Sequence, residues 1–403
     1  MKDYLFSTLK AGLLLTLLNT NLAYAAANTP AADGETPASL SCIYGLTPNV
    51  PGCPIATTTA VPQGGSGIIA VIEGGDDPNA LTELTVFSNQ FNLNVLSSCT
   101  GNPAPCFQTY YADTCTVGTS SNNAGIIEPQ IDVQWAHAMA PHASIYMIEA
   151  DSWGLSDLLT AVQCANQLLA RTGGIVSISA SFDEFSDEVN LDSNFQKPKI
   201  IYLGSSGDYQ APARYPSSSP YVISVGGTNI VRDSAGNYLN QTAWSNVGSG
   251  AIPCDKLPCR TGVSGGPSLF EPRPSFQKSV QKIVGTQRGT PDVSFVAQAV
   301  DVFCCGSSAT NGCPAPSTSC PTDGVWVRTG GTSLATPAIA GIINSAHSGA
   351  TTSAEELKII YDGSLKHYHE YWTDIILGNN GYPALAGYDF TTGLGVPRGY
   401  GGK

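Results

Sequence analysis

The segment GGTSLATP (residues 330–337) and the small-residue run AIAG (338–341) that follows it are the most informative part of this 403-residue chain. A strand-like run at 325–328 leads into the glycine turn, and Ser333 then opens a helix in which Pro337 falls near the first turn. A serine hydroxyl at a helix N-terminus lies beside backbone N–H groups that can hold developing negative charge. An N-cap serine would explain the position as well, but it does not require the rest of the pattern. We therefore take Ser333 as a candidate nucleophile.

The composition favours a folded protein that does not bind nucleic acid. Hydrophobic residues make up 42% of the chain and charged residues 12%, and 31 Asp and Glu against 18 Lys and Arg give a net charge of −13. That balance opposes binding to a phosphate backbone. Few charged groups also means few carboxylates whose protonation would unfold the protein, which suits an acidic medium.

Twelve cysteines indicate a disulfide framework in an oxidising compartment. Tetrathiolate zinc, the alternative, usually shows two C-x2-4-C knuckles, and apart from the adjacent pair at 304–305 the sequence contains one such spacing, Cys254-x4-Cys259, without a second to pair with it. The close spacings that support disulfides are Cys99 with Cys106, Cys254 with Cys259 and Cys313 with Cys320.

The N-terminus predicts export. Lys2 and Lys10 precede or flank a short apolar run at 11–18, and the A-x-A pattern at 23–25 is typical of a cleavage site. We expect residues 1–25 to be a secretory signal peptide and residues 26–60 to be a short pro-segment or linker. No other stretch is long and apolar enough to span a bilayer.

Short apolar runs alternate with helical patterns after residue 67. The runs at 68–72, 144–148, 175–178, 200–203 and 221–225 predict buried strands, and 157–171 predicts a helix. This alternation predicts an α/β fold with a central, mostly parallel sheet flanked by helices. Residues 26–67 and the Cys-, Pro- and Ser-rich stretch 248–321 are expected to be loops.

The motif at 331–337 resembles the nucleophile motif of the subtilisin-like fold, whose classical members use a histidine base. None of the five histidines, at 137, 142, 347, 367 and 369, stands in the matching His-Gly-Thr-His type of motif. Carboxylates fit better, because Glu128 and Asp132 are four residues apart on one face of a helix that Pro129 can open. The alternative is a solvated acidic face, but the apolar residues around them indicate a largely buried helix, in which two close carboxyls should share a proton.

A third acid, Asp208, ends the run LGSSGD at 203–208, directly after a predicted strand. Sites in α/β proteins commonly lie at strand ends, although an aspartate there can also be a turn residue.

Together these residues resemble the sedolisin family, the serine-carboxyl peptidases. The resemblance covers about residues 67–397 and includes the Glu128-x-x-x-Asp132 motif, the Ser-Gly-Asp element at Asp208, the YP, SP and VGGT elements within 215–228, RGTPDV at 288–293 and the GTS at 331–333. It implies a subtilisin-like three-layer fold and a peptidase domain over residues 61–403.

By this resemblance Ser333 is the nucleophile, Glu128 its general base, Asp132 the partner that orients Glu128, and Asp208 the acid of the oxyanion hole. A glutamate near pKa 4.3 is matched to acid, where an imidazole is mostly protonated. The implied reaction is hydrolysis of peptide bonds at low pH through a serine acyl-enzyme, by an endopeptidase or a tripeptidyl-peptidase. We expect a secreted monomer that acts on proteins or peptides, without a membrane partner once the signal is removed.

The C-terminal segment interleaves carboxylates with glycines, a composition that suits Ca²⁺ and is equally typical of a turn-rich tail. The resemblance implies one structural calcium ion. Its ligands would be the carboxylates of Asp374 and Asp389 and the backbone carbonyls of Ile375, Leu385 and Gly387. Leu385 replaces a frequent glycine, a change that a carbonyl ligand tolerates.

Two departures from the family pattern stand out. Tyr209 and Gln210 follow Asp208 where the family usually has Ser-Gly. In addition, only about 40 residues separate the predicted signal from the first strand, whereas the family usually carries a large prodomain there. One further acid after the first strand, at or near Asp76, Asp77 or Glu83, could join the carboxyl set, and the sequence assigns it no role.

Two other functions fit the sequence less well. One is a secreted serine esterase, because GVSGG at 262–266 matches G-x-S-x-G, with Ser264 as nucleophile and histidines downstream. The other is a catalytically silent, calcium-stabilised binding protein on the same scaffold, which the Tyr209-Gln210 departure would suit.

Overall fold

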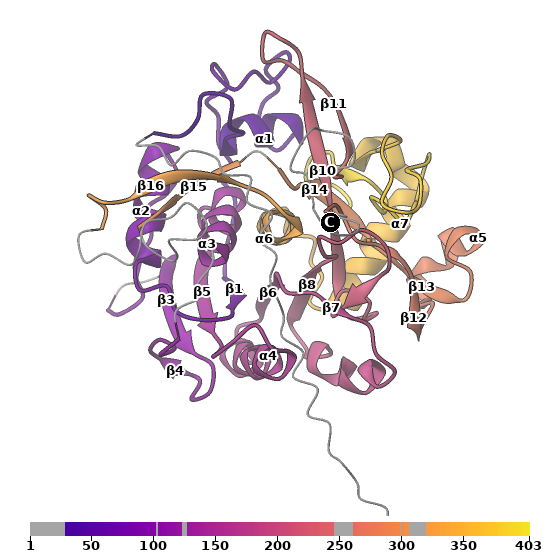
Figure 1. Cartoon of the computed structure of the whole chain (residues 1–403), viewed down its shortest axis with the longest axis horizontal. Helices are drawn as coiled ribbons and strands as arrows, with labels where there is room; N and C mark the ends of the chain where they lie inside the picture. Colours follow the sequence, from indigo (N-terminus) through magenta and orange to yellow (C-terminus); the bar gives the residue numbers. More distant parts are fainter. Residues whose placement is uncertain (1–28, 102–103, 123–126, 246–260, 299, 306–319) are drawn as a thin grey trace, which may run out of the picture.

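A computed structural model describes residues 29–101, 104–122, 127–245, 261–298, 300–305 and 320–403, and Figure 1 shows their arrangement. The predicted signal peptide lies outside these residues. All five apolar runs predicted as strands lie in the sheet at the centre of the described chain.

The central sheet has ten strands in the described part of the chain, and its main path runs β11-β10-β8-β6-β1-β5-β3-β2. Neighbours along this path are parallel except β10 and β11, while β14 adds a parallel neighbour to β10 and β4 an antiparallel one to β3. The strands are β1 Ile68–Glu73, β2 Ser97–Ser98, β3 Cys106–Tyr111, β4 Thr116–Val117, β5 Ser144–Glu149, β6 Gly174–Ile178, β8 Ile200–Ser205, β10 Ile223–Arg232, β11 Tyr238–Ala243 and β14 Val293–Val296.

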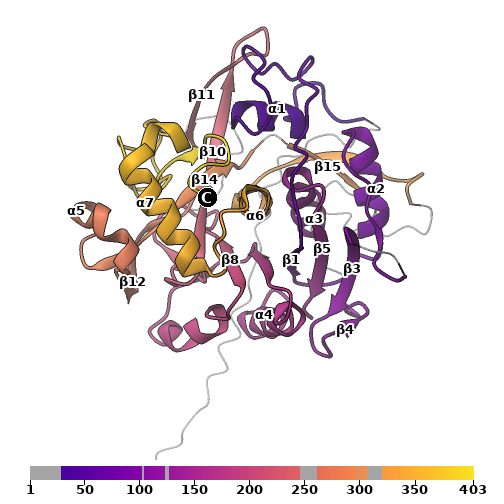
Figure 2. The ribbon, with the colours of Figure 1, turned by 180° about the vertical axis from the view of Figure 1, so that it is seen from behind.

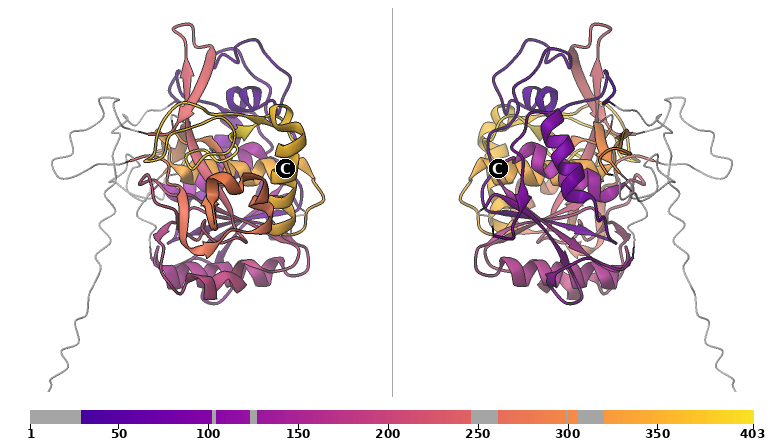
Figure 3. Two further views of the ribbon diagram at one scale, coloured as in Figure 1. Left: turned by 90° about the vertical axis from the view of Figure 1, so that its right-hand side faces the viewer. Right: turned by 90° about the vertical axis from the view of Figure 1, so that its left-hand side faces the viewer.

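Helices cover both faces of this sheet, as the α/β prediction requires. The helices are α1 Pro37–Ile43, α2 Ala80–Gln90, α3 Glu128–Met139, α4 Leu155–Leu169, α5 Gln281–Val284, α6 Thr332–Ala346 and α7 Ser353–Tyr371, with 3-10 turns η1 Glu188–Phe195 and η2 Ser275–Val280. The side views place α4, in magenta, beneath the sheet and the other long helices above it (Figure 3). Figure 2 shows α6 and α7 from behind, beside β8.

Alternate residues of each central strand point to opposite faces of the sheet and pack into two different hydrophobic cores. In β1, Ile69 and Val71 pack with α3 and α6, whereas Ala70 and Ile72 pack with α4. A strand buried on both faces must be apolar at consecutive positions, which is why these strands appear as unbroken apolar runs in the sequence. The subtilisin-like three-layer arrangement predicted from the sequence is therefore present.

The stretch 248–321 is not a set of long loops where the structure describes it. It contains β12 Gly266–Pro272 paired with β13 Gln287–Thr290, the sheet strand β14, and β15 Val300–Cys304 paired with β16 Val325–Thr329. Two further short pairs join β7 Phe182–Asp183 to β9 Arg214–Tyr215 and β17 Trp372–Thr373 to β18 Val396–Pro397. The loop prediction was wrong there because Pro, Cys and Ser residues interrupt the apolar runs by which short strands are recognised in a sequence.

The prediction of a loop over residues 26–67 was also wrong in part, because α1 forms there. Thr36 caps α1 with a capping box: the Ser39 N–H donates to Thr36 Oγ1 at 3.1 Å, and the Thr36 N–H donates to Ser39 Oγ at 2.9 Å. Pro37 supplies a first helical residue that lacks an N–H to satisfy.

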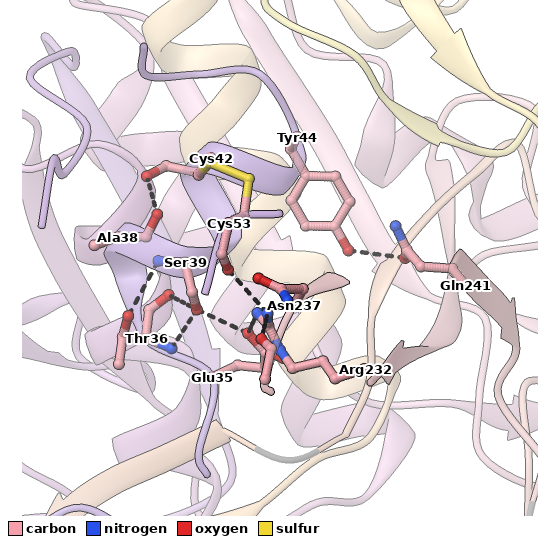
Figure 4. Close-up of polar contacts among 12 residues, drawn as sticks. Glu35, Thr36, Ala38, Ser39, Cys42, Tyr44, Cys53, Arg232, Asn237 and Gln241 are labelled. Atoms are coloured by element: carbon pink, nitrogen blue, oxygen red, sulfur yellow. Dashed lines mark hydrogen bonds and ion pairs between the residues drawn. A yellow bond between two sulfur atoms is a disulfide. The ribbon is translucent and has the colours of Figure 1, made fainter. Parts of the chain in front are cut away.

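This N-terminal segment is tied to the β10–β11 hairpin (Figure 4). The buried carboxylate of Glu35 accepts two hydrogen bonds from the Arg232 guanidinium, both 2.6 Å long. The buried Tyr44 hydroxyl donates to Gln241 Oε1 at 3.1 Å, and its ring stacks on Phe295 at 4.2 Å between centroids. Residues 29–60 therefore pack into the same body as the sheet.

Four disulfides lie within the described residues, joining Cys42 to Cys53, Cys99 to Cys106, Cys115 to Cys164 and Cys305 to Cys320. The disulfide framework expected from the cysteine content is therefore present, while its pairing, which the sequence left open, joins Cys99 to its near neighbour Cys106 and Cys320 to Cys305. Cys254 and Cys259 lie outside the described residues. Over the part of the chain that the structure covers, no helix is long and apolar enough to cross a membrane.

Candidate active site

Ser333 is the second residue of α6, directly after the glycine turn that follows β16. Gly331 has φ +124°, and a side chain there would place its Cβ 2.9 Å from Asp208 Oδ2. Its N–H donates to the Ala297 carbonyl at 2.7 Å, which fixes the turn. A glycine is thus required for the start of α6 to approach Asp208, and Ser333 stands half-buried at the N-terminal end of this helix.

Glu128 is the first residue of α3, and Pro129 follows it in the first turn, as predicted. Glu128 is half-buried, whereas Asp132, one turn later, is fully buried behind it. Ser333 lies close enough to Glu128 for its hydroxyl to lower the pKa of that carboxyl. The structure thus brings together a hydroxyl, a carboxyl beside it and a second carboxyl behind that one.

Ser179, which follows β6, connects this set of residues. Its hydroxyl lies 2.9 and 2.7 Å from the two Asp132 carboxyl oxygens and 3.4 Å from the Ser333 carbonyl. The Ser333 hydroxyl in turn lies 3.4 Å from the Ser179 carbonyl. The Ser333 carbonyl is open to this contact because Pro337 has no N–H to donate to it within the helix.

Asp208 lies three residues beyond the end of β8 and contacts Thr332, the residue before Ser333. Its Oδ1 accepts the Thr332 N–H at 2.9 Å and the Thr332 hydroxyl at 2.6 Å. The same hydroxyl accepts the Gly207 N–H at 3.2 Å. Thr332, the first residue of α6, thus occupies Oδ1, and the other oxygen, Oδ2, lies beside Gly331 in the turn before the helix.

The helices that carry Ser333 and Glu128 cross at close range. Gly341 of α6 faces Ala136 and Met139 of α3, and a Cβ at this glycine would lie 2.7 Å from both the Ala136 carbonyl oxygen and the Met139 Cβ. The small residues that follow the serine motif therefore allow the two helices to approach.

The two loops predicted to bind calcium lie together. Asp374 Oδ2 accepts the Gly387 N–H at 3.0 Å, and Asp389 Oδ2 accepts the Leu385 N–H at 2.8 Å. Ile375 is buried next to Asp374. The described residues contain no group of three or more His, Cys, Asp or Glu side chains suited to a metal, so a cation here would need backbone carbonyls beside the two carboxylates.

Residues 114–359 match the family model described as "Subtilase family". The chain belongs to the subtilase family.

Among curated proteins this subtilase is similar to Sedolisin of Pseudomonas sp. (strain 101), at 27% identity over 92% of the chain and 60% of the relative. It is similar to Kumamolisin of Bacillus sp. (strain MN-32), at 27% identity over 81% of the chain and 59% of the relative. Xanthomonalisin of Xanthomonas sp. (strain T-22) is 33% identical over 45% of the chain and 20% of the relative. The chain thus spans 60% or less of each relative's length.

Among solved structures, Pseudomonas sedolisin, described as a serine-carboxyl proteinase complexed with two molecules of pseudo-iodotyrostatin, matches with a TM-score of 0.66 at 23% identity. The match covers 91% of this chain and 96% of that one. The S41 psychrophilic protease matches with a TM-score of 0.52 at 15% identity, over 91% and 99%. These similarities confirm the predicted subtilisin-like fold and the resemblance to sedolisins.

Burial changes the acid–base properties of the subtilase site. It raises the pKa of Glu128 to about 8, an effect that the nearby Ser333 hydroxyl partly offsets, and it raises the pKa of Asp208. Burial and the neighbouring Glu128 charge raise the pKa of Asp132 well above its ordinary value. The pKa of Glu128 is therefore not the ordinary value near 4.3 from which its match to acid was argued. It belongs to a set of carboxyls that hold protons jointly.

Sequence reasoning missed two residues of this set, Ser179 and Glu73. Glu73 ends β1, is 1% exposed, and neither carboxyl oxygen has a hydrogen-bond partner among the described residues. Burial and the charges of Asp132 and Glu128 raise its pKa well above the ordinary value. Its signal in the sequence was an acid at the end of an unbroken apolar strand.

The histidine-dependent alternative gains no support. Ser264 is fully buried, its hydroxyl accepts the Tyr209 N–H at 3.1 Å, and its own N–H donates to the Gly207 carbonyl at 2.7 Å. It lies between Gly262 and the start of β12, outside any helix. His137 is buried in α3 with Nε2 2.7 Å from the Asn94 carbonyl, as expected for a structural histidine.

Proposed function

We propose that this protein is a secreted serine-carboxyl peptidase that hydrolyses peptide bonds in acid. The observation that carries the proposal is the convergence of Ser333, Glu128, Asp132 and Asp208 from the starts of two helices and the end of one strand. These are the four residues that the sedolisin resemblance assigns. They supply a nucleophile, a base, an orienting acid and an oxyanion donor.

In the first step Ser333 Oγ attacks the substrate carbonyl carbon while its proton passes to Glu128. Asp132, held by Ser179, keeps the Glu128 carboxyl oriented and shares a proton with it. The pair can accept the Ser333 proton only after it has lost one of its own two protons. The pH of this first ionisation therefore sets the acid limit of activity. Glu128 then returns the proton to the leaving amine, and water hydrolyses the acyl-enzyme by the same steps in reverse order.

The tetrahedral intermediate needs donors for its oxyanion. A protonated Asp208 would donate from Oδ2, because Thr332 binds Oδ1, and backbone N–H groups at the start of α6 add partial positive charge. Burial raises the pKa of Asp208, so this residue stays protonated to a higher pH than a free aspartate would. Its ionisation sets the alkaline limit.

The decisive experiment is hydrolysis of a denatured protein substrate by the purified mature protein from pH 2.5 to 9. We expect turnover that rises with the first ionisation of the Glu128–Asp132 pair and falls with the ionisation of Asp208, with its peak on the acid side of neutral pH. It should be abolished by Ser333→Ala and survive in Ser264→Ala. Activity that peaks near pH 8 and needs Ser264 would support the esterase-type enzyme instead. Absence of turnover at every pH, with a folded protein, would favour the silent binding protein.

We also propose one structural Ca²⁺ between the loops at 374–375 and 385–389. Asp374 and Asp389 would supply the charged oxygens, and the carbonyls of Ile375, Leu385 and Gly387 the neutral ones. Burial raises the pKa of Asp389 to about 6, and a bound cation would offset that cost of ionisation.

Export is part of the same proposal. The disulfides among the described residues need an oxidising compartment, and the predicted signal at residues 1–25 would direct the chain there. The expected substrates are proteins and peptides, and the expected state is a monomer.

A further inference from the structure

The glycine turn that precedes Ser333 is held by the residue that follows β14. The Ala297 carbonyl accepts the Gly331 N–H at 2.7 Å, and a Cβ at Gly330 would overlap the same carbonyl oxygen. Ala297 is fully buried, and its own N–H donates to the Thr228 carbonyl of β10 at 2.8 Å. The place of Ser333 at the start of α6 therefore depends on where the end of β14 lies.

One side chain of the N-terminal segment holds this end of β14. Val296, the last residue of the strand, donates its backbone N–H to the Tyr44 hydroxyl at 2.9 Å, across 252 residues of sequence. The hydroxyl donates in turn to Gln241 Oε1, as Figure 4 shows, and Gln241 Oε1 also accepts the Thr228 hydroxyl at 2.7 Å. The Tyr44 hydroxyl thus uses both its lone pair and its proton to join the segment to β14 and to the β10–β11 hairpin.

Tyr44 is itself fixed from several directions. It ends α1, where its N–H donates to the Leu40 carbonyl at 2.9 Å, and its carbonyl accepts the Gly399 N–H at 2.6 Å. Tyr44 and Val296 are both 0% exposed, so water does not reach the bond between them. Removal of the hydroxyl would leave the Val296 N–H without an acceptor among the described residues, which costs more than the net contribution of an ordinary hydrogen bond.

We propose that Tyr44 is a positioning residue for the nucleophile: its hydroxyl holds the end of β14, and through the Ala297 carbonyl it keeps the turn before Ser333 in place. The inference rests on the proposed function for its catalytic meaning, although the hold on the turn can be measured without activity. It also gives residues 29–60 a role in the active enzyme, because their removal as a pro-segment would take Tyr44 away.

Hydrogen exchange measures the hold on the turn directly. The measurement uses the Ser333→Ala background, which prevents self-digestion, and mass spectrometry of the peptide that contains Gly331. Tyr44→Phe removes the hydroxyl and keeps the ring that stacks on Phe295. We expect the Gly331 peptide to exchange about 10-fold faster in this variant, because the strand end that holds the turn opens more easily.

Tyr202→Phe is the matched control. Tyr202 of β8 is also fully buried, and its hydroxyl donates to Asn166 Oδ1 at 2.5 Å in the core on the α4 side of the sheet. This variant loses a buried tyrosine hydroxyl that has no connection to the turn, so its Gly331 peptide should exchange as in the unmodified background. Equal acceleration in Tyr202→Phe and Tyr44→Phe would show a general loss of stability and overturn the proposal.

Gln241→Leu guards against a Tyr44→Phe protein that does not fold. It leaves Tyr44 in place and removes the acceptor that orients its hydroxyl. We expect the Gly331 peptide to exchange faster than in the unmodified background, by less than in Tyr44→Phe. An unchanged rate in the folded variants would contradict the role of Tyr44.

Steady-state kinetics with Ser333 present add a readout that a merely structural role would not move. At the pH of peak activity we expect Tyr44→Phe to lower kcat by about 10-fold with KM nearly unchanged, because a displaced nucleophile impairs the reaction more than substrate binding. Tyr202→Phe should keep both values at a temperature at which both variants are folded. A kcat that Tyr44→Phe leaves unchanged would overturn the positioning role.

The two proposals fail separately. If the unmodified enzyme shows no turnover, the proposed function fails, and hydrogen exchange still decides whether Tyr44 holds the turn. If turnover is found but Tyr44→Phe exchanges and reacts like the unmodified protein, only the role of Tyr44 is rejected.

Discussion

The hydroxyl of Ser179 lies within 2.9 Å of both carboxyl oxygens of Asp132, so one small side chain fixes the acid behind the proposed base. Asp132 is fully buried, and the charge that acts on it is that of Glu128. The orientation of Asp132, and through it that of Glu128, therefore depends on a neutral hydroxyl rather than on an ion pair.

Ser179→Ala is expected to lower kcat by about 10- to 100-fold, since a lost hydrogen bond to a buried charged group costs about 1.5–3 kcal/mol. KM should change little, because the hydroxyl is occupied by Asp132. Steady-state kinetics at pH 4 measure both. Ser177→Ala is the matched control, because the buried Ser177 hydroxyl has no partner among the described residues. Equal losses in the two variants would contradict the assigned role of Ser179.

Asp208→Asn should extend activity to higher pH. An amide donates a hydrogen bond at every pH, whereas an aspartic acid stops donating once it ionises. We expect the alkaline limb of the kcat profile to move to higher pH in Asp208→Asn. Asp208→Ala should lose about 10²- to 10³-fold in kcat at pH values where Asp208 is protonated in the unmodified enzyme. An alkaline limb that stays in place in Asp208→Asn would show that another group sets it.

Stability should fall as pH rises from about 4 towards 8. Burial raises the pKa values of Asp77, Glu128 and Glu149 to about 6, 8 and 9. The folded chain then binds more protons than the unfolded chain over this interval, so the free energy of unfolding decreases with pH, by about 1 kcal/mol or more per unit. Denaturant unfolding of Ser333→Ala at several pH values checks the sign. A free energy that increased over this range would refute the assignment.

Gly341→Ala should weaken both the fold and the activity. Alanine normally favours a helix over glycine by about 1 kcal/mol, but its Cβ here would lie 2.7 Å from atoms of α3, and such overpacking costs about 1–3 kcal/mol. The α6 and α3 axes would separate, and Ser333 would move from Glu128. Gly363→Ala in α7 is the control: its Cβ would meet nothing closer than 3.4 Å, so the variant should be neutral or more stable. Unfolding curves and kcat for both variants make the comparison.

Removal of calcium should lower the melting temperature. A chelator is expected to destabilise the unmodified protein and to have little further effect on Asp389→Asn, which lacks one charged ligand of the proposed ion. Calorimetry with and without added Ca²⁺ gives the result. A melting temperature that the chelator leaves unchanged in the unmodified protein would reject the ion.

The sequence predicted those parts of the fold that depend on local pattern. The strands of the central sheet are apolar on both faces, and the glycine turn before Ser333 and the Glu128–Asp132 spacing are local as well. The short strands between 266 and 304 were missed because their pairing partners, not their own composition, make them strands. Helix α1 was missed although its Thr-Pro-x-Ser cap is visible in the sequence.

Properties of the site that depend on tertiary structure could not be predicted. Ser179 meets Asp132 from 47 residues away, and Gln130 meets Asp77 and Glu83 across a separation of 53 and 47 residues. The pKa of Glu128 could not be predicted either, because its shift comes mainly from burial that α3 acquires only in the assembled fold.

The N-terminal segment has a consequence for the order in which the chain can fold. Glu35 meets Arg232 across 197 residues, and Asp33 meets Arg328 across 295. During synthesis the first ordered residues must wait for partners made much later, and contacts of such high sequence separation slow folding. A truncation after the central strands would leave α1 without these partners. The N-terminal segment of the nascent chain therefore lacks its partners, and can misfold, until Arg328 has been synthesised.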